Sequence, residues 1–236
     1  AFRAVLAAVE DGTLSESRIE RSVERVLRLK ERLGLLDDAF VDAAAAADAL
    51  GVPSHRAVAR AAGEAAVTVL RLQPERRLPV PDGWSILVTG WHDAGVKALP
   101  DTLEAAGRTV EVLWTGERPG AREIAKATKV QREHDITVVV TAYLGAYPEQ
   151  RQLVKELDRK GRTIIVSVRS PYDLAWFPAA PVLVATYGST PVTMKALARI
   201  LQGEIGASGT SPVRIPYPGR NQTLFPFGSG VTWTAP

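Results

Sequence analysis

The sequence predicts an α/β fold: a doubly wound, mostly parallel sheet with helices on both faces, forming an α/β/α sandwich. From Ser85 to Ala185, short β-branched apolar runs alternate with longer stretches of helical periodicity. This is the order expected of parallel strands joined by crossover helices. The runs are apolar throughout, which is typical of strands buried on both faces. Right-handed crossovers then place helices on each side of the sheet.

The ends of these elements carry their own signals. Several helical stretches stop at a glycine, which takes a left-handed conformation easily. The segment 73–83 holds three prolines and several charges and is predicted to be a loop. The expected strands are 67–72, 86–89, 109–114, 136–141, 163–168 and 182–185, and the expected helices include 53–66, 96–106, 121–131, 149–160 and 191–202.

The clearest local signals lie in the stretch Thr186–Pro216. Thr190 is a good N-cap residue, because its hydroxyl can accept from a free amide of the first turn. Pro191 suits the first helical position, where no amide donor is needed. Apolar residues at helical spacing follow, and Gly203 is placed to end the helix. The Pro- and Gly-rich end of the chain, 212–236, is expected to wrap the surface.

The first part of the chain predicts two amphipathic helices without partner strands. Thr13–Glu16 has the pattern of a capping box that starts the second helix, and Gly34 is placed to end it. Its many arginines form a solvated face with pairs such as Glu24–Arg28. The segment 37–51 is expected to be a connector, in which 43–47 could form a short helix but has no large apolar residue to anchor it. Ser54 is the expected cap of the next helix. Two amphipathic helices cannot bury their apolar stripes alone, so these should pack on something outside this chain or on the domain that follows.

Composition excludes several classes of function. The chain has 236 residues, a net charge of +3 and 46% hydrophobic residues, and no basic stripe that would predict nucleic-acid binding. Its longest apolar runs are about ten residues, too short to span a membrane. Three scattered histidines and no cysteine give no metal-ligand spacing, so no metal is predicted. No glycine pattern for a dinucleotide occurs, and no cofactor is predicted. The absence of cysteine leaves the compartment open, with export or a cell-surface lipoprotein somewhat favoured over the cytoplasm.

Thr186–Pro216 resembles the end of the C-terminal domain of glycoside hydrolase family 3 enzymes, where Ala-Tyr-Gly, a helix, Gly-Glu and Ser-Gly-x-x-Pro-Val follow in this order. Further blocks are similar to the family and occur in the family's order, so that the resemblance covers nearly the whole chain. The four further blocks are Arg18–Gly34, Arg60–Leu72, Gln152–Leu174 and Thr223–Thr234.

This resemblance implies that the chain is the C-terminal part of a longer protein. Residues 1–36 would be the last helices of an otherwise absent (β/α)8 catalytic barrel. Residues 37–54 would be a linker, and residues 55–236 the α/β/α sandwich with an extended tail. The family's catalytic Asp nucleophile and sugar-gripping Lys-His segment belong to the barrel, so no residue of this chain is predicted to be catalytic. The chain alone should be inactive, because glycoside hydrolysis needs two catalytic groups.

One departure from the family pattern points to a branch. In β-glucosidase members, a long insertion after the third strand carries the acid/base glutamate. Here Val140–Gln150 passes directly from strand to helix, and Ser170–Leu174 also resembles the β-N-acetylhexosaminidase branch, whose acid/base is a His–Asp pair on a barrel loop. The implied activity is retaining hydrolysis of terminal β-linked N-acetylglucosamine from cell-wall or chitin-derived oligosaccharides. The alternatives are a β-glucosidase or β-xylosidase, or a non-catalytic glycan-binding or dimerisation module.

Residues at predicted strand ends are the candidates for a rim facing the barrel cleft, or for plain packing at a domain interface. His92–Asp93 also follows a strand. A neighbouring His and Asp do not by themselves make a catalytic pair, and capping of the next helix is the favoured role for Asp93. The candidate rim residues are Tyr143, Arg169, Tyr172, Asp173, Tyr187 and Gly188.

Overall fold

The computed structural model describes residues 1–73, 78–160 and 162–235. Part of the loop expected at 73–83, and the last residue of the expected tail, therefore lie outside the described residues. Contacts between Cα atoms divide the chain into two compact units, Ala1–Pro53 and Ser54–Pro236. Each unit is described by itself below.

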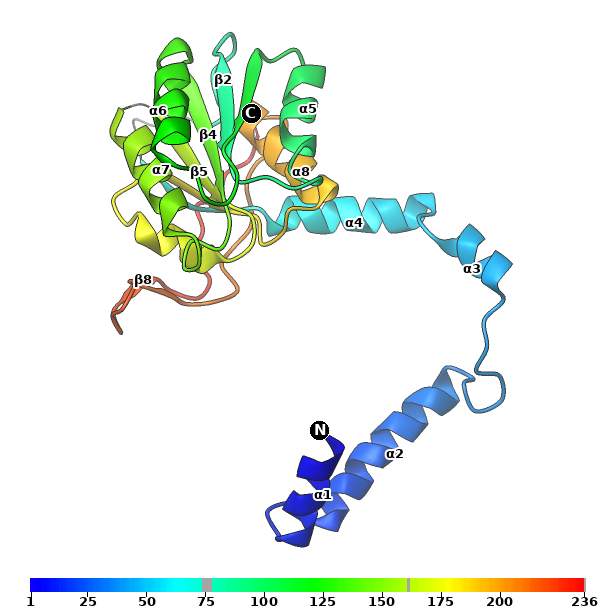
Figure 1. Ribbon diagram of the computed structural model, residues 1–236. Coiled ribbons are helices and arrows are strands. Elements are labelled where there is room, and N and C mark those ends of the chain that lie inside the picture. The colour runs from blue at the N-terminus through cyan, green and yellow to red at the C-terminus, as the bar shows by residue number, and fades with distance from the viewer. Residues whose placement is uncertain (74–77, 161, 236) are drawn as a thin grey trace. The chain divides into compact units, whose positions relative to one another are not determined.

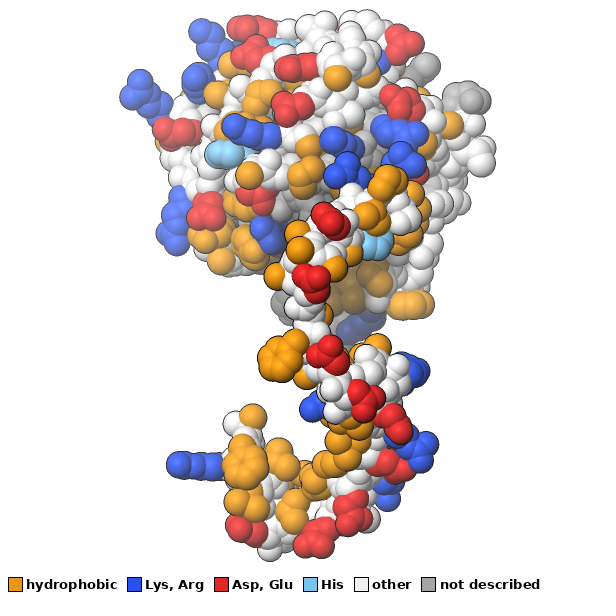
Figure 2. Space-filling model, turned by 90° about the vertical axis from the view of Figure 1, so that its right-hand side faces the viewer, with side chains coloured by type: hydrophobic (Ala, Val, Ile, Leu, Met, Phe, Trp, Pro, Cys, Tyr) orange, Lys and Arg blue, Asp and Glu red, His pale blue; other side chains and the backbone are white. Residues whose placement is uncertain are grey.

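The first unit is built from helices that expose their apolar residues. In residues 1–53, all of which the structure describes, no side chain is buried. Hydrophobic side chains gather on the concave side of the first two helices, while charged residues cover the outer side of the second (Figure 2). The helices are α1 (Phe2–Glu10), α2 (Glu16–Arg32) and α3 (Ala43–Ala49).

The ends of α2 confirm one sequence prediction and correct another. Gly34 has a φ of +71° and follows the last turn of α2 directly, as predicted. The predicted capping box at Thr13 is wrong, since the residue in the N-cap position is Ser15. The Thr13 amide instead donates to Oδ1 of Asp11 at 2.8 Å, because a nearer carboxylate satisfies it within the preceding turn. The predicted pair Glu24–Arg28 is present at 2.6 Å.

The second unit is organised around a six-stranded sheet in the order β1-β6-β5-β4-β2-β3. Strands β2 to β6 run parallel to one another, and β1 pairs with β6 in the antiparallel direction. The predicted mostly parallel sheet is confirmed. The strands are β1 (Thr68–Leu72), β2 (Ile86–Gly90), β3 (Val110–Trp114), β4 (Ile136–Thr141), β5 (Thr163–Ser167) and β6 (Val182–Ala185).

Helices cover both faces of this sheet, which confirms the predicted α/β/α sandwich. Helices α5 and α8 lie against one face, and α6 and α7 lie against the other (Figure 1). The helix α4 packs on α8, where Gly63 approaches Val192. Ser54 lies inside α4 rather than before it, so its predicted role as a cap is wrong. The helices of this unit are α4 (Pro53–Ala66), α5 (Ala98–Ala105), α6 (Ala121–Val130), α7 (Pro148–Lys160) and α8 (Pro191–Gln202), with 3-10 turns η1 (Gln131–Glu133) and η2 (Pro171–Trp176).

Alternate residues of each central strand feed two separate cores. On β5, Ile164 and Val166 join the core under α5 and α8, and Ile165 joins the one under α6 and α7. On β6, Val184 and Leu183 divide in the same way. All five are nearly inaccessible to solvent. The uninterrupted apolar runs in the sequence therefore arise because both faces of each strand are buried.

Helix α8 follows its sequence signals closely. The hydroxyl of Thr190 accepts from the Thr193 amide at 3.4 Å, and Pro191 occupies the first turn. Gly203 takes a left-handed φ of +79° directly after the helix. A side chain there would meet the ring of Pro79 at 2.8 Å, so the stop signal also packs against a neighbouring loop.

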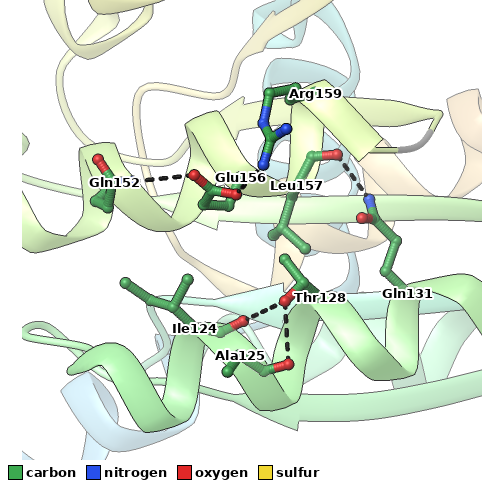
Figure 3. A network of polar contacts seen from close by, with 8 residues as sticks. All are labelled: Ile124, Ala125, Thr128, Gln131, Gln152, Glu156, Leu157 and Arg159. Carbon is green, nitrogen blue, oxygen red and sulfur yellow. Dashed lines mark hydrogen bonds and ion pairs between the residues drawn. The ribbon is translucent and has the colours of Figure 1, made fainter.

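A polar network joins the two helices on the other face (Figure 3). The buried side chain of Gln131, at the end of α6, donates to the Leu157 carbonyl of α7 at 3.0 Å. One turn earlier, the Thr128 hydroxyl donates back to Ile124 within its own helix. On α7, Glu156 accepts from Arg159 at 2.8 Å. Gln131 therefore ties the two helices together where their apolar side chains pack.

The last part of the chain is packed more deeply than predicted. It forms a short antiparallel pair, β7 (Ile215–Pro216) and β8 (Thr223–Phe225). Ile215 and Phe225 are buried in the core beneath α7 and η2. The amide of Val231 donates to the Val69 carbonyl of β1 at 2.7 Å. The expectation of a surface wrapping is therefore incomplete, because its few apolar residues are placed where the sandwich has room for them.

Candidate functional site at the carboxyl edge of the sheet

The sheet has a topological switch point between β2 and β4. From β2 the chain crosses to β3 on one side, and from β4 it continues to β5 and β6 on the other. The crossover helices leave in opposite directions there, so the loops that follow β2 and β4 come from opposite sides of the sheet. Open α/β sheets bind ligands at this position, beyond the carboxyl ends of the strands.

Two aromatic rings stand at the switch point. Trp91 directly follows β2, and Tyr143 lies just after β4. Their ring centroids are 6.4 Å apart with the planes at 83°, an edge-to-face arrangement. Trp91 is buried, whereas 44% of Tyr143 is exposed. The pair therefore offers one open aromatic face supported by a buried one.

Arg169, which follows β5, completes this cluster. Its guanidinium lies 5.6 Å from the Trp91 ring and 5.7 Å from the Tyr143 ring, within the range of cation–π contact. Its Nη2 also pairs with Oδ2 of Asp93 at 3.3 Å. The side chain is still 42% exposed, so it can reach a ligand at this edge.

Asp93 is held by donors on both of its oxygens. Oδ1 accepts from the amides of Gly95 and Val96 at 2.9 Å each, and Oδ2 accepts from the Ser189 hydroxyl at 2.6 Å. Burial alone would raise the pKa of Asp93, but these hydrogen bonds and the charge of Arg169 outweigh burial and lower it. The carboxylate therefore positions the loops and Arg169 and caps the turn at Gly95 and Val96. The expectation that Asp93 caps the next helix is wrong, because α5 begins at Ala98 with Lys97 in the N-cap position.

The backbone at this edge is strained at two tyrosines. Tyr143 and Tyr187 have φ angles of +59° and +56°, where residues other than glycine are uncommon. The Tyr143 carbonyl accepts from the amides of Ala146 and Tyr147 and so closes a tight turn. Such outliers persist only where the surrounding structure fixes them, and they gather at ligand-binding positions.

Asp173 supports that turn from below. It is 5% exposed, and its Oδ1 accepts from the Leu144 amide at 3.1 Å. Burial raises the pKa of Asp173 to about 6, against the opposing effect of hydrogen bonds from the Leu144 and Tyr143 amides. The residue is therefore a support for the Tyr143 turn rather than a group that faces the opening.

The structure separates the six predicted rim residues. Tyr143 and Arg169 come together at the switch point. The Tyr187 ring packs against the core under α6 and α7, and the Gly188 carbonyl accepts from the Thr186 hydroxyl at 2.9 Å. Tyr172 lines a different hollow, with Trp176 and residues 216–221. Their proposed role at a barrel cleft remains a prediction.

The sequence reasoning missed Trp91 and Ser189. Trp91 is the first residue after β2, so the strand-end rule that selected Tyr143 could have found it. Ser189 has no such signal, because its hydroxyl is aimed at Asp93 only through the packing of the β6–α8 loop on the β2–α5 loop. That approach is close: a side chain on Gly95 would lie 1.9 Å from the Ser189 carbonyl.

This arrangement is suited to binding. Asp93 is hydrogen-bonded on both oxygens and paired with Arg169, so it is not free to act as a general base. His92 instead stacks on Trp114 with centroids 5.1 Å apart. In residues 1–73, 78–160 and 162–235, no group of three or more His, Cys, Asp or Glu side chains is placed to hold a metal ion. An exposed aromatic face beside a guanidinium fits a hydroxyl-rich ligand with apolar faces.

The fold and the site define the class of protein domain: an α/β/α sandwich whose loops at the carboxyl ends of the strands form the candidate binding site. No family model matches the chain. The chain is 30% identical over 237 residues to the β-N-acetylglucosaminidase/β-glucosidase of Cellulomonas fimi, matching 90% of this chain and 41% of that protein. It is 26% identical to the lysosomal β-glucosidase of Dictyostelium discoideum, over 36% of that protein.

Solved structures agree with this. A glycoside hydrolase family 3 β-N-acetylglucosaminidase from Paenibacillus sp. str. FPU-7 superposes with a TM-score of 0.66 at 29% identity, covering 88% of this chain and 41% of that one. A Listeria innocua β-glucosidase in complex with isofagomine gives 0.70 at 20% identity, which supports the fold. The resemblance to family 3 β-N-acetylglucosaminidases indicated by the sequence blocks is confirmed.

The chain spans about two-fifths of the length of these relatives. The relatives therefore have further sequence beyond the part that matches. Within the residues that the structure describes, no helix is both long and apolar enough to cross a membrane.

Proposed function

We propose that the chain is the C-terminal part of a family 3 glycoside hydrolase that removes terminal β-linked N-acetylglucosamine by a retaining mechanism. The observation that carries the proposal is the match to the Cellulomonas fimi protein over 90% of this chain. The substrates would be cell-wall or chitin-derived oligosaccharides. The catalytic groups would lie in a (β/α)8 barrel that precedes the sandwich, and the chain alone would be inactive.

The short connection after β4 supports the branch. The chain goes from the end of β4 at Thr141 to the start of α7 at Pro148, and residues 142–147 form a compact turn. A loop of this size holds Tyr143 and Leu144 close to the sheet and cannot carry an acid/base group far from it. A hydrolase with this domain would draw both catalytic groups from its barrel, as the resemblance to the β-N-acetylhexosaminidase branch implies.

The first unit supports a barrel in the same protein. Helices α1 and α2 line an apolar groove of about 380 Å³ with Phe2, Leu6 and Ile19, and a second groove of about 500 Å³ follows α2 past Leu27. In a (β/α)8 barrel, outer helices bury such faces against the strands. Residues 1–36 would be the last helices of that barrel, 37–54 a linker, and 55–236 the sandwich domain.

The switch-point edge would form one rim of the substrate cleft. Tyr143 and Arg169 offer an aromatic face and hydrogen-bond donors there, and Asp173 fixes the turn. In the full-length enzyme, Arg169→Ala would then raise the KM for an oligosaccharide more than it lowers kcat, because the residue binds substrate remote from the scissile bond. If the KM of this variant were unchanged, Arg169 would not bind the substrate and would not belong to the cleft.

The activity itself is tested with the full-length protein on aryl β-N-acetylglucosaminide and aryl β-glucoside. We expect a higher kcat/KM on the N-acetylglucosaminide. A preference for glucoside would overturn the branch assignment and favour the second candidate, a β-glucosidase or β-xylosidase. The β-glucosidase alternative is supported by the second activity in the name of the Cellulomonas fimi protein and by the Dictyostelium discoideum β-glucosidase. A protein inactive on both substrates would favour a non-catalytic glycan-binding or dimerisation module.

A further inference from the structure

An open hollow of about 610 Å³ lies between the 3-10 turn η2 and the turn that joins β7 to β8. Its volume is within the range of ligand sites, about 300–1,000 Å³. It is lined by Tyr172, Ala175, Trp176 and residues 216–221. Two segments that are far apart in the sequence therefore build one surface depression.

Three aromatic side chains line this hollow. Tyr172 is 47% exposed and Trp176 37%, and Tyr217 is half-buried. Exposed aromatic rings gathered at one place are typical of a recognition surface, because each ring offers a flat apolar face at little conformational cost. Tyrosine and tryptophan also carry a polar group at the ring edge, which suits a ligand that is partly apolar and partly hydroxylated.

The Trp176 ring and the backbone around the hollow are held in place before any ligand arrives. The guanidinium of Arg151 lies 4.1 Å from the Trp176 ring centroid and covers one part of it. The Tyr217 amide donates to the Gln222 carbonyl at 2.9 Å and closes the opposite turn. Beneath them, Leu174 and Ile215 are fully buried. The parts of this surface that are already fixed lose little entropy when it binds.

The polar lining of the hollow includes an arginine, which donates, and an asparagine, whose side-chain amide both donates and accepts. Arg220 and Asn221 contribute a guanidinium and an amide, and no Asp or Glu is among the described residues that line it. A pyranose ring matches this surface, since its C–H face packs on an aromatic ring while its hydroxyl and acetamido groups bond to guanidinium and amide. Several such rings in a row would engage several aromatic side chains.

We propose that this hollow binds a β-linked oligosaccharide through stacking on Tyr172, Trp176 and Tyr217. The choice of β-linked sugars as the ligand class rests on the proposed function. The binding site itself stands on the aromatic lining and the donors. A proline-rich peptide is the competing ligand, because such peptides also dock in aromatic grooves.

The test uses the 236-residue chain and two probes, triacetylchitotriose and cellotriose, followed by tryptophan fluorescence and calorimetry. We expect saturable binding of at least one sugar. Tyr172→Ala and Trp176→Ala should each weaken it by about two- to tenfold, the loss expected for one stacked ring. Phe227→Ala is the matched control, because Phe227 is 76% exposed and does not line the hollow.

Absence of sugar binding would overturn the proposal. It would also be overturned if binding survived both substitutions and disappeared in Tyr143→Ala, or if a PxxP peptide bound and the sugars did not. Circular dichroism checks folding, and if Trp176→Ala unfolds, Tyr172→Ala carries the test. Hydrolysis by the full-length protein is a separate measurement. If the protein hydrolyses the sugars but this hollow does not bind them, only the proposal of a binding site in the hollow is overturned. If the hollow binds the sugars but the protein does not hydrolyse them, only the proposed activity is overturned.

Discussion

The two compact units of this chain both contain amphipathic helices, but they differ in how much of the apolar faces of those helices they bury. Helix α2 in residues 1–53 and helix α7 in residues 54–236 are both amphipathic. Leu157 of α7 is fully buried, whereas Leu27 of α2 is 47% exposed. Periodicity alone makes a helix with an apolar face, but only a second layer of structure can cover that face.

The contrast extends to every element of the first unit. Phe2, Leu33 and Phe40 are 80%, 60% and 90% exposed, although they are residue types that usually lie inside proteins. In the second unit, both faces of the sheet are closed by helices and the apolar side chains fill two cores. The first unit thus exposes an apolar surface of the kind that is usually buried against other structure, which fits the proposed barrel.

Core deletions should show the largest difference between the units. Leu157→Ala removes a fully buried side chain and should lower the free energy of unfolding by about 2–5 kcal/mol. Leu27→Ala should change it by no more than about 0.5 kcal/mol in this chain, since half of that side chain is in water. Urea unfolding followed by tryptophan fluorescence measures the second unit, because all five tryptophans lie in residues 54–236.

Far-UV circular dichroism of the same samples covers the first unit. A loss for Leu27→Ala as large as that for Leu157→Ala would mean that the apolar stripe of α2 is buried in the isolated chain. The contrast between the units would then be wrong, and the need for a covering barrel would disappear with it.

Two glycines with positive φ give a second matched pair. At Gly90, φ is +104° and a side chain would lie 2.2 Å from the Val140 carbonyl of the neighbouring strand. Gly90→Ala should cost about 2–4 kcal/mol, combining backbone strain with overpacking. At Gly34, φ is +71° with nothing within 4 Å, so Gly34→Ala should cost about 1 kcal/mol from strain alone. Equal costs in urea unfolding would show that strain, rather than packing, decides both.

The sequence predicted the elements well because periodicity and stop residues act locally. The strands of the sheet, the helix at Pro191 and its end at Gly203 all depend on a few neighbouring residues. The predicted N-cap roles of Thr13 and Ser54 were wrong because several polar residues near the start of a helix can act as its N-cap. Small differences in local geometry decide which of them does so. The antiparallel direction of β1 was not predictable, since it depends on how the chain enters the sheet.

The site was predicted only in part, for a different reason. Tyr143 and Arg169 were found because each follows a strand. That Trp91 lies beside Tyr143 depends on β2 pairing with β4, and strand order is a long-range property that no local pattern states. Tyr187 follows a strand equally well, yet its ring packs on a core. Strand ends therefore select candidates, and the sheet order decides which of them meet.

Asp173 offers a pH test of the second unit. Its pKa is raised by burial from 3.8 to about 6, so the folded chain holds this proton more tightly than the unfolded chain. The stability contribution is therefore greatest below about pH 4, falls as pH rises to about 6, and is constant above, with a total change of at most about 3 kcal/mol. Asp173→Asn keeps an oxygen acceptor for the Leu144 amide and should remove this fall.

The measurement is urea unfolding of the parent chain and Asp173→Asn between pH 4 and pH 7.5. Asp101→Asn, on the exposed surface of α5, controls for the loss of one negative charge. If the parent and Asp173→Asn curves ran parallel across this range, Asp173 would not carry the proton, and its burial would be less complete than the structure shows. Residues 1–53 contain no buried carboxyl group, so their unfolding gives no such signal.

The smallest expected difference lies in two ion pairs. In the second unit, Arg199 of α8 bonds to Glu64 of α4, and both side chains are half-buried. The Arg199 Nε also donates to the exposed Glu204 carboxylate at 2.9 Å. In the first unit, Arg28 pairs with Glu24 one turn away, and both are largely exposed. Arg199→Ala should cost about 1 kcal/mol and Arg28→Ala no more than about 0.5 kcal/mol, because exposed pairs gain little over hydration.

Double-mutant cycles with Glu64→Ala and Glu24→Ala isolate the two couplings, measured by urea unfolding at low and at high salt. We expect the Arg199–Glu64 coupling energy to be larger and less sensitive to salt than the Arg28–Glu24 coupling energy, because the side chains of Arg199 and Glu64 are less exposed to counterions. It is also the ion pair that links α4 to the sandwich. A coupling as small as that of Arg28 would mean that α4 is held on α8 by apolar contact alone, where Gly63 meets Val192.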